Sequence, residues 1–229
     1  MRPPPRPARS AFTVIELMVV IGVIALLVGL LVPAVFMGKR TANQTYCTNN
    51  MRQIGLGILQ FAQHHNGDFP KAVGHAGAEN SDSWVFTLAP YIDNCDKIRI
   101  CPDDPQKEAR LATRGTSYVM NGWVADTRRG AVNNLERLRN RARTITVFEG
   151  ADQRSLAMTQ DHVHSYNWFN TTNRKRGTTW QAITGEIQVD RHQGASNYLY
   201  ADGHVESIKA DTLKSLADEG TDFSLPPKF

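Results

Sequence analysis

The chain has 229 residues, of which 41% are hydrophobic and 21% charged, and its formal net charge is +4. These fractions are typical of a folded protein and exclude a wholly disordered chain, and the length suits one globular domain with an additional element. The basic residues Arg2, Arg6 and Arg9 lie in the first eleven positions, where there is no acidic residue. The excess positive charge therefore belongs mostly to a targeting segment, not to a surface that binds a polyanion.

The first predicted element is an apolar helix. Residues 17–37 carry no charged side chain, and at 1.5 Å per residue a helix of this length spans about 30 Å, the thickness of a bilayer's hydrocarbon core. The run is longer than the apolar part of a cleaved secretory signal, which favours a membrane anchor. Pro33 lies inside it, and we expect a bend there; the alternative is that Pro33 ends the anchor.

Glu16 lies at the front edge of this apolar run. A carboxylate at that depth is costly unless it forms an ion pair or accepts hydrogen bonds. The first turn of a helix favours negative charge. A cut between Ala11 and Phe12 would also create an α-amine about one helical turn away, or on a neighbouring chain. Glu16 is therefore a candidate assembly residue.

The helix is predicted to continue with a change of character after Arg40. Apolar residues recur at spacings of four, three, four and three, which places them on one helical face. They are Cys47, Met51, Ile54, Ile58 and Phe61. The turn-forming residues 66–70 end the pattern. We expect one helix from Phe12 to about residue 65, with a membrane half at 12–40 and an amphipathic half at 41–66.

Residues 67–229 are predicted to form a globular head of short strands and polar loops. Expected strands are 117–120, 144–148, 186–189, 197–201 and 204–208, and short helices are expected at 84–91 and 211–217. The last two strands flank Asp202-Gly203, which favours a two-residue hairpin with a type I′ turn. The predicted fold class is α+β, with an antiparallel sheet packed on the second half of the long helix.

The front end resembles a known export signal. Ala11-Phe12-Thr13-Val14-Ile15-Glu16, between a basic leader and an apolar run, is similar to the class III signal of type IV pilins and type II secretion pseudopilins. The resemblance implies that a prepilin peptidase removes residues 1–11 and methylates the amine of Phe12. It also implies that Glu16 recruits the subunit by contacting the Phe12 amine of an adjacent chain. The family usually has Gly where Ala11 stands.

The head resembles the pseudopilin-like proteins of planctomycetes, whose head has no known function. The similar stretches are 46–70, 100–104, 117–123 and 191–208. Those proteins share a His followed after nine residues by Asp-Gly, which His192, Asp202 and Gly203 match. We expect His192 to anchor the hairpin through a backbone hydrogen bond. Asp103 stands where this family more usually has Ser.

Three cysteines suit an oxidising exterior better than a metal site. Because Cys47 and Cys101 both lie in the stretches that resemble the family, a disulfide between them is the first expectation. A local disulfide between Cys95 and Cys101 is the alternative.

Two sets of residues suggest metal ions. His162 and His164, with Asp161, form a His-x-His pattern, and His192, Asp202 and His204 could join them at a divalent cation; histidines in loops are the favoured interpretation. Major pseudopilins of the secretion class bind calcium near C-terminal loops, so calcium is a second option. The acidic residues available for it are Asp211, Asp218, Glu219 and Asp222, which do not have EF-hand spacing. No other cofactor is expected.

Two groups of basic residues were weighed as a phosphate-binding surface. They are Arg137, Arg139, Arg141 and Arg143, and Arg174, Lys175 and Arg176. Acidic residues lie close by and no aromatic residues are interleaved, so these are expected to be solvated loop charges, and no nucleic acid is expected as a partner.

Taken together, these patterns predict a structural protein, not an enzyme. The expected role is a pseudopilin-like subunit, crossing the bacterial inner membrane once and carrying its head in the periplasm. Expected partners are the prepilin peptidase, the inner-membrane assembly platform, membrane lipid, and further pseudopilins, including copies of this chain in a filament. The alternatives are a membrane-tethered ligand-binding or enzymatic head, and a minor pseudopilin of DNA uptake.

Overall fold

The computed structural model describes residues 13–72, 83–93, 95–126, 130–156 and 161–227. The chain divides into two compact units, residues 1–40 and residues 41–229. Each unit is described by itself below. Residues 41–66, which the sequence analysis separated from the head, belong to the same compact unit as the head.

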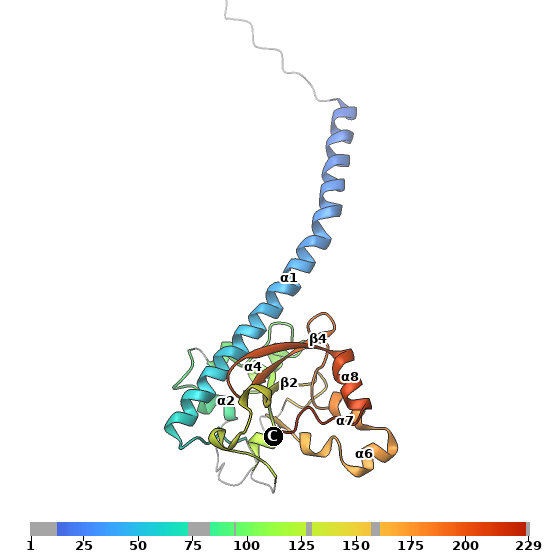
Figure 1. Cartoon of the computed structure of the whole chain (residues 1–229). Coiled ribbons are helices and arrows are strands. Elements are labelled where there is room, and N and C mark those ends of the chain that lie inside the picture. Colours follow the sequence, from blue (N-terminus) through green and yellow to red (C-terminus); the bar gives the residue numbers. More distant parts are fainter. Residues whose placement is uncertain (1–12, 73–82, 94, 127–129, 157–160, 228–229) are drawn as a thin grey trace, which may run out of the picture. The chain divides into compact units, whose positions relative to one another are not determined.

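The long helix α1 extends over Val14–His64 (Figure 1). Pro33 lies inside it, and the helix continues beyond this proline; where the membrane anchor ends stays a prediction. A proline costs the helix a hydrogen bond, but the apolar residues on both sides keep the helical conformation. By its length and composition, α1 can cross a membrane.

Within the unit of residues 41–229, α1 is amphipathic as predicted. Cys47, Met51, Ile54 and Ile58 are at most 2% exposed, and the partly buried Phe61 packs against the same core. The buried face of α1 also contains Gly55, where an added Cβ would lie 2.8 Å from the Leu199 side chain. The helix thus lies directly on the sheet.

The sheet has five strands in the order β3-β1-β2-β4-β5. All neighbours are antiparallel except β1 and β3, which are parallel. The strands are β1 Tyr118–Asn121, β2 Ile145–Glu149, β3 His162–Val163, β4 Ala195–Tyr200 and β5 Val205–Lys209. This is the predicted α+β class with a mostly antiparallel sheet, in a pilin-like arrangement.

One predicted strand is wrong. Residues 186–189 contribute a single bridge, between Ile187 and Gly150. The backbone here continues the pairing of β2 by two hydrogen bonds, from Ala151 N to Glu186 O and from Gln188 N to Glu149 O. The chain then turns at residues 190–194, so the contact is too short to become a strand.

Apolar residues alternate between the two faces of the sheet, and both faces are buried. Met120, Val147 and Leu199 belong to a core that also contains the buried face of α1. Val119, Phe148 and Tyr198 belong to a second core, formed with the helices α7 (Thr179–Thr184) and α8 (Ala210–Asp218). In Figure 1 the end of α1 and the helices α7 and α8 lie to either side of β2 and β4. Because both faces are covered, every residue of β1 and β2 is buried, including the polar Asn121, Thr146 and Glu149.

The remaining helical elements are short. They are α2 Trp84–Thr87, α3 Cys95–Ile98, α4 Lys107–Ala112, α5 Gly122–Ala125 and α6 Thr171–Arg176, with 3₁₀ turns at Leu135–Arg137, Arg141–Arg143 and Ser165–Asn167. The helix predicted at 84–91 ends at Thr87, and the helix predicted at 211–217 is α8.

The hairpin at Asp202-Gly203 is present, but its turn differs from the prediction. Only Gly203, with φ of 92°, has a positive φ, whereas a type I′ turn requires two such residues. Gly203 N donates to Tyr200 O, and Tyr200 N donates to His204 O. This is a three-residue loop, in which the turn is closed by one glycine in the left-handed region. Asp202 instead uses its carboxylate to accept a hydrogen bond from His204 N.

Candidate functional sites on the apolar helix and in the head

The N-terminal end of α1 is capped by reciprocal hydrogen bonds between Thr13 and Glu16. The Glu16 carboxylate accepts from Thr13 N at 2.9 Å and from Thr13 Oγ1 at 2.8 Å, and Glu16 N donates to Thr13 Oγ1 at 3.2 Å. Thr13 precedes the first helical residue and Glu16 is the third residue of the helix, which is the geometry of a capping box. Glu16 therefore has partners within its own chain.

The sequence analysis missed this cap, although its signal is present. A Thr followed three positions later by Glu, directly before an apolar run, is the sequence pattern of a capping box. The candidate processing residues Ala11 and Phe12 lie outside the described residues. The contact between Glu16 and a neighbouring amine therefore stays a prediction.

The helix within residues 13–40 exposes apolar side chains in every direction. The exposed fractions of its large apolar side chains range from 46% at Val32 to 74% at Ile15. These side chains lie on every side of the helix. A helix that is apolar on every side is typical of a membrane span or of the interior of a helical bundle. This part of α1 is thus a candidate surface for lipid and for other helices, and Pro33 lies within it; the bend at Pro33 stays a prediction.

In the head, a disulfide joins Cys47 of α1 to Cys101, with the two Cα atoms 5.3 Å apart. This is the first of the two pairings considered, and it excludes the local alternative between Cys95 and Cys101. The Cys95 thiol instead donates to Val85 O at 3.4 Å. The disulfide connects the long helix to the loop between α3 and α4, across 54 residues of chain.

His192 lies beside this disulfide in a buried polar cluster. Its Nδ1 is 3.1 Å from Asp103 Oδ2, and its Nε2 is 2.9 Å from Glu149 Oε1 and 3.8 Å from Cys101 Sγ. The backbone of His192 also exchanges two hydrogen bonds with Ala195, the first residue of β4. These bonds close the turn that leads into β4, and the imidazole ring has a separate set of partners; the anchoring of the Asp202-Gly203 hairpin by His192 stays a prediction.

Glu149, at the end of β2, is the centre of this cluster and was not identified from the sequence. It is 1% exposed, and besides His192 it accepts from Ser196 Oγ at 2.6 Å and from Asn197 Nδ2 at 3.1 Å. Burial alone would lower the pKa of His192, but the hydrogen bond and charge of Glu149, with the charge of Asp103, raise it above its ordinary value. Burial and the Glu149 charge likewise raise the pKa of Tyr118.

The remaining histidines do not join His192. His162 pairs with Asp161 at 2.9 Å, and His204 pairs with Asp202 at 2.6 Å. His164 bonds Glu186 through both its backbone N and its Nδ1. Among the described residues, the ligand atoms of these histidines do not gather with those of His192, so the combined site considered from the sequence is not assembled. In the part of the chain that the structure describes, the metal-ligand atoms that converge are those of Cys47, Cys101, Glu149 and His192.

The acidic residues considered for calcium have local partners. Asp218 forms an ion pair with Lys214 at 2.7 Å, and Asp222 accepts from Ser224 Oγ at 2.6 Å. Burial raises the pKa of Asp222, although its hydrogen bonds to Ser224 oppose this. Calcium binding stays an option for which no ligand residues are assigned.

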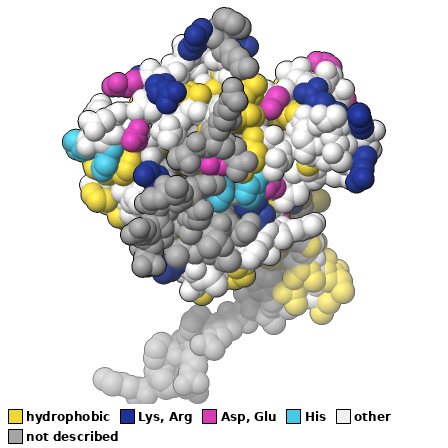
Figure 2. Space-filling view, turned by 90° about the horizontal axis from the view of Figure 1, so that it is seen from below, with side chains coloured by type: hydrophobic (Ala, Val, Ile, Leu, Met, Phe, Trp, Pro, Cys, Tyr) yellow, Lys and Arg dark blue, Asp and Glu magenta, His cyan; other side chains and the backbone are white. Residues whose placement is uncertain are grey.

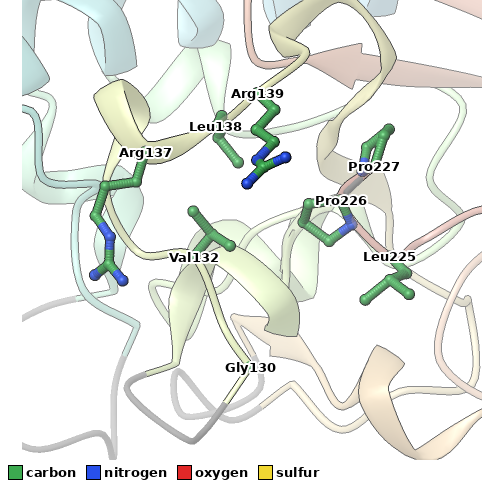
Figure 3. Close-up of a pocket in the computed structure, with 8 residues that line it drawn as sticks. All are labelled: Gly130, Val132, Arg137, Leu138, Arg139, Leu225, Pro226 and Pro227. Carbon is green, nitrogen blue, oxygen red and sulfur yellow. The ribbon is translucent and has the colours of Figure 1, made fainter. Parts of the chain in front are cut away.

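Two of the clustered arginines border a pocket of about 310 Å³ (Figure 3). Its other lining residues are Gly130, Val132, Leu138, Leu225, Pro226 and Pro227. The Arg139 side chain points toward Pro226, whereas the guanidinium of Arg137 points away from the prolines. The pocket is at the small end of the range for organic ligands.

The basic side chains are dispersed on the surface seen in Figure 2. Lys and Arg lie at separate places on this face of the head, with Asp and Glu between several of them. A groove that follows a nucleic-acid backbone is instead lined by a continuous row of positive charge. Whether nucleic acid is a partner stays a prediction.

Comparison with known proteins gives one similarity. Residues 39–97 match the model of a family described as "Protein of unknown function (DUF1559)". No curated protein and no solved structure matches the chain. The matched stretch contains the helical face that packs on the sheet, including Cys47, and ends shortly before Cys101. Over this stretch the chain is similar to that family, and its architecture is pilin-like.

Proposed function

We propose that this protein is a pseudopilin-like structural subunit of a type II secretion or type IV pilus-like system. The observation that carries the proposal is the division of α1. Its residues 14–37 expose apolar side chains all round, whereas Cys47, Met51, Ile54 and Ile58 are buried against the head. One helix thus offers an apolar surface for lipid or for other helices and also supports a folded polar domain.

Physical chemistry requires that the exposed apolar part be covered. Burial of apolar surface contributes about 25 cal/mol per Å², so a helix of this kind is unstable in water and partitions into lipid or into a bundle. The inner membrane supplies the first environment and a filament of similar helices supplies the second. Prepilin peptidase, an inner-membrane assembly platform and further pseudopilins are the partners that this cycle needs.

Glu16 is proposed to change partner during assembly. In the single chain it accepts from Thr13. After removal of residues 1–11, the Phe12 amine of an adjacent subunit would provide a cation for the same carboxylate. In a low-dielectric bundle a carboxylate interacts more strongly with an ammonium than with the uncharged donors of Thr13, which favours the exchange.

Mass spectrometry of the mature N-terminus tests the proposal. The expected product begins at Phe12 with a methylated amine, and filaments containing the protein should form in cells that also make the assembly platform. A native protein that retains Arg2, Arg6 and Arg9 would contradict the processing step and with it the filament. Where Glu16→Ala is used to remove the assembly carboxylate, Glu219→Ala on the exposed surface of the head is its matched control.

The head is proposed to act by packing and to lie in the periplasm, where the Cys47–Cys101 disulfide is stable against reduction. We do not assign it an enzymatic reaction. Calcium binding by the head would be detected as a calcium-dependent rise in its melting temperature.

The pocket beside Arg139 favours a second candidate, a membrane-tethered head that binds a small ligand. Its apolar walls and the nearby guanidinium suit an apolar anion. The two candidates differ in their response to Arg139→Gln. That change should abolish ligand binding in the second case and leave filament assembly unaltered in the first.

A further inference from the structure

The buried cluster around the disulfide has more groups than a disulfide needs. The candidate ligand atoms of Cys47, Cys101, Glu149 and His192 all lie within 4.8 Å of one another. All four residues are at most 3% exposed. The two sulfurs alone suffice to link α1 to the loop between α3 and α4, so the link does not explain why an imidazole and a carboxylate lie beside them.

Neighbouring side chains orient His192 and Glu149 in the way that metal ligands are oriented in a protein. Asp103 lies 3.1 Å from His192 Nδ1 and thereby directs Nε2 toward the sulfur and Glu149. Ser196 Oγ donates to Glu149 Oε2, which leaves Oε1 facing His192. A carboxylate behind a ligating imidazole, and a hydrogen bond behind a ligating carboxylate, are the usual outer contacts of a zinc site.

We propose that the head binds one thiophilic divalent cation, zinc by preference, through Cys47, Cys101, His192 and Glu149 when the Cys47–Cys101 disulfide is reduced. Two thiolates with an imidazole and a carboxylate select zinc over calcium or magnesium. The oxidised head, in which the sulfurs are bonded to each other, does not hold the ion. The disulfide and the cation are alternative links between the same two segments.

The exchange balances with a dithiol as reductant. The dithiol transfers two electrons and two protons to the sulfur–sulfur bond, becomes a disulfide itself, and leaves two thiols on Cys47 and Cys101. The cation then replaces the two thiol protons and the proton shared between His192 Nε2 and Glu149 Oε1. Three protons leave and two positive charges enter, while the nearby positive charge of Arg191 remains.

The distances require only small movements. Tetrahedral zinc, with bonds of about 2.0–2.3 Å, places neighbouring ligand atoms about 3.3–3.8 Å apart. Cys101 Sγ and His192 Nε2 are already separated by 3.8 Å, and His192 Nε2 and Glu149 Oε1 by 2.9 Å. The two sulfurs must separate once their bond is broken, by rotation of side chains whose Cα atoms are 5.3 Å apart. Asp103, with a side chain 22% exposed, lies between the cluster and solvent.

The test uses the full chain in detergent micelles with Cys95→Ser, which removes the third thiol. The protein is reduced with a phosphine and titrated with Co²⁺, whose thiolate charge-transfer and tetrahedral ligand-field bands report the ligands. We expect one Co²⁺ per chain, displaced by Zn²⁺, and no bands from the oxidised protein. His192→Gln and Glu149→Gln should each weaken binding at least about 10-fold, and Asp103→Asn about 10- to 100-fold.

Matched variants separate this site from nonspecific binding. His204→Gln removes an exposed histidine that also pairs with a carboxylate, and it should leave the titration unchanged. The proposal is overturned if the reduced, folded chain shows no cobalt–thiolate bands, or if His192→Gln, Glu149→Gln and Asp103→Asn all leave them unchanged. If reduction unfolds the chain, refolding is followed by near-ultraviolet circular dichroism. Recovery that depends on Zn²⁺ supports the site, and recovery equal without Zn²⁺ contradicts it.

Discussion

The Thr13 hydroxyl donates to the Glu16 carboxylate and accepts from the Glu16 backbone N–H, so that the residue expected to hold a neighbouring subunit also caps its own helix. The two roles are separable by mutation. They differ in the partner on which Glu16 depends.

Thr13→Val and Glu16→Ala distinguish the roles. Thr13→Val removes the hydroxyl but keeps the shape of the side chain, so the helix end loosens while the carboxylate remains available to a neighbour. We expect filaments in Thr13→Val and none in Glu16→Ala, with normal removal of residues 1–11 in both, as measured by electron microscopy and mass spectrometry. Equal loss of filaments in both variants would assign the effect to the cap, and normal filaments in Glu16→Ala would refute the assembly role.

Removal of the disulfide should destabilise the head strongly. The bond closes a loop across 54 residues, for which the chain-entropy relation gives about 4 kcal/mol of unfolding free energy. The double change Cys47→Ser and Cys101→Ser should therefore lower the unfolding free energy, and the slope of the denaturant transition should rise because the unlinked denatured chain is less compact. Cys95→Ser is the control, and it should cost much less. A loss as large in the control would indicate that Cys95 carries the structural link.

Gly203 should tolerate alanine poorly. Its φ of 92° lies in the region that favours glycine, and an added Cβ would also approach Leu59 of α1 to 3.2 Å. Backbone strain of this kind costs about 1–3 kcal/mol. Gly194→Ala is the matched control, because Gly194 has φ of 85° with no atom within 4 Å of the added Cβ. Thermal unfolding should show a larger loss for Gly203→Ala, and equal losses would exclude a contribution from the contact with α1.

Glu186 should make the stability of the head depend on pH. Burial alone would raise its pKa, but hydrogen bonds from His164 and Trp168 and the charge of Arg154 lower it below its ordinary value of 4.5. A lowered pKa in the folded state stabilises the protein above pH 4.5, and this contribution is lost as pH falls through the folded-state value. The difference in unfolding free energy between wild type and Glu186→Gln should therefore shrink on acidification below pH 4.5. Glu219→Gln should show no such trend, and a constant difference for Glu186→Gln would contradict the assigned cause.

Local patterns identified most of the elements. The apolar run and the recurrence of Cys47, Met51, Ile54 and Ile58 predicted α1 to within one residue of its C-terminal end. The hairpin around Asp202-Gly203 followed from its turn residues, although the turn type did not. The strand predicted at 186–189 failed because its length depends on how far the chain can follow β2 before it turns, which no local pattern records.

The sequence by itself determined that a long helix precedes the head, apolar in its first part and amphipathic in its second, because helical periodicity depends only on residues three and four positions apart. Only the tertiary structure decided that Cys47 pairs with Cys101, that Glu149 is buried, and that His192 lies between Glu149 and Asp103. These contacts join residues 43 to 89 positions apart. Which side chains meet over such separations depends on strand order, register and the packing of both cores, and these are properties of the whole folded head.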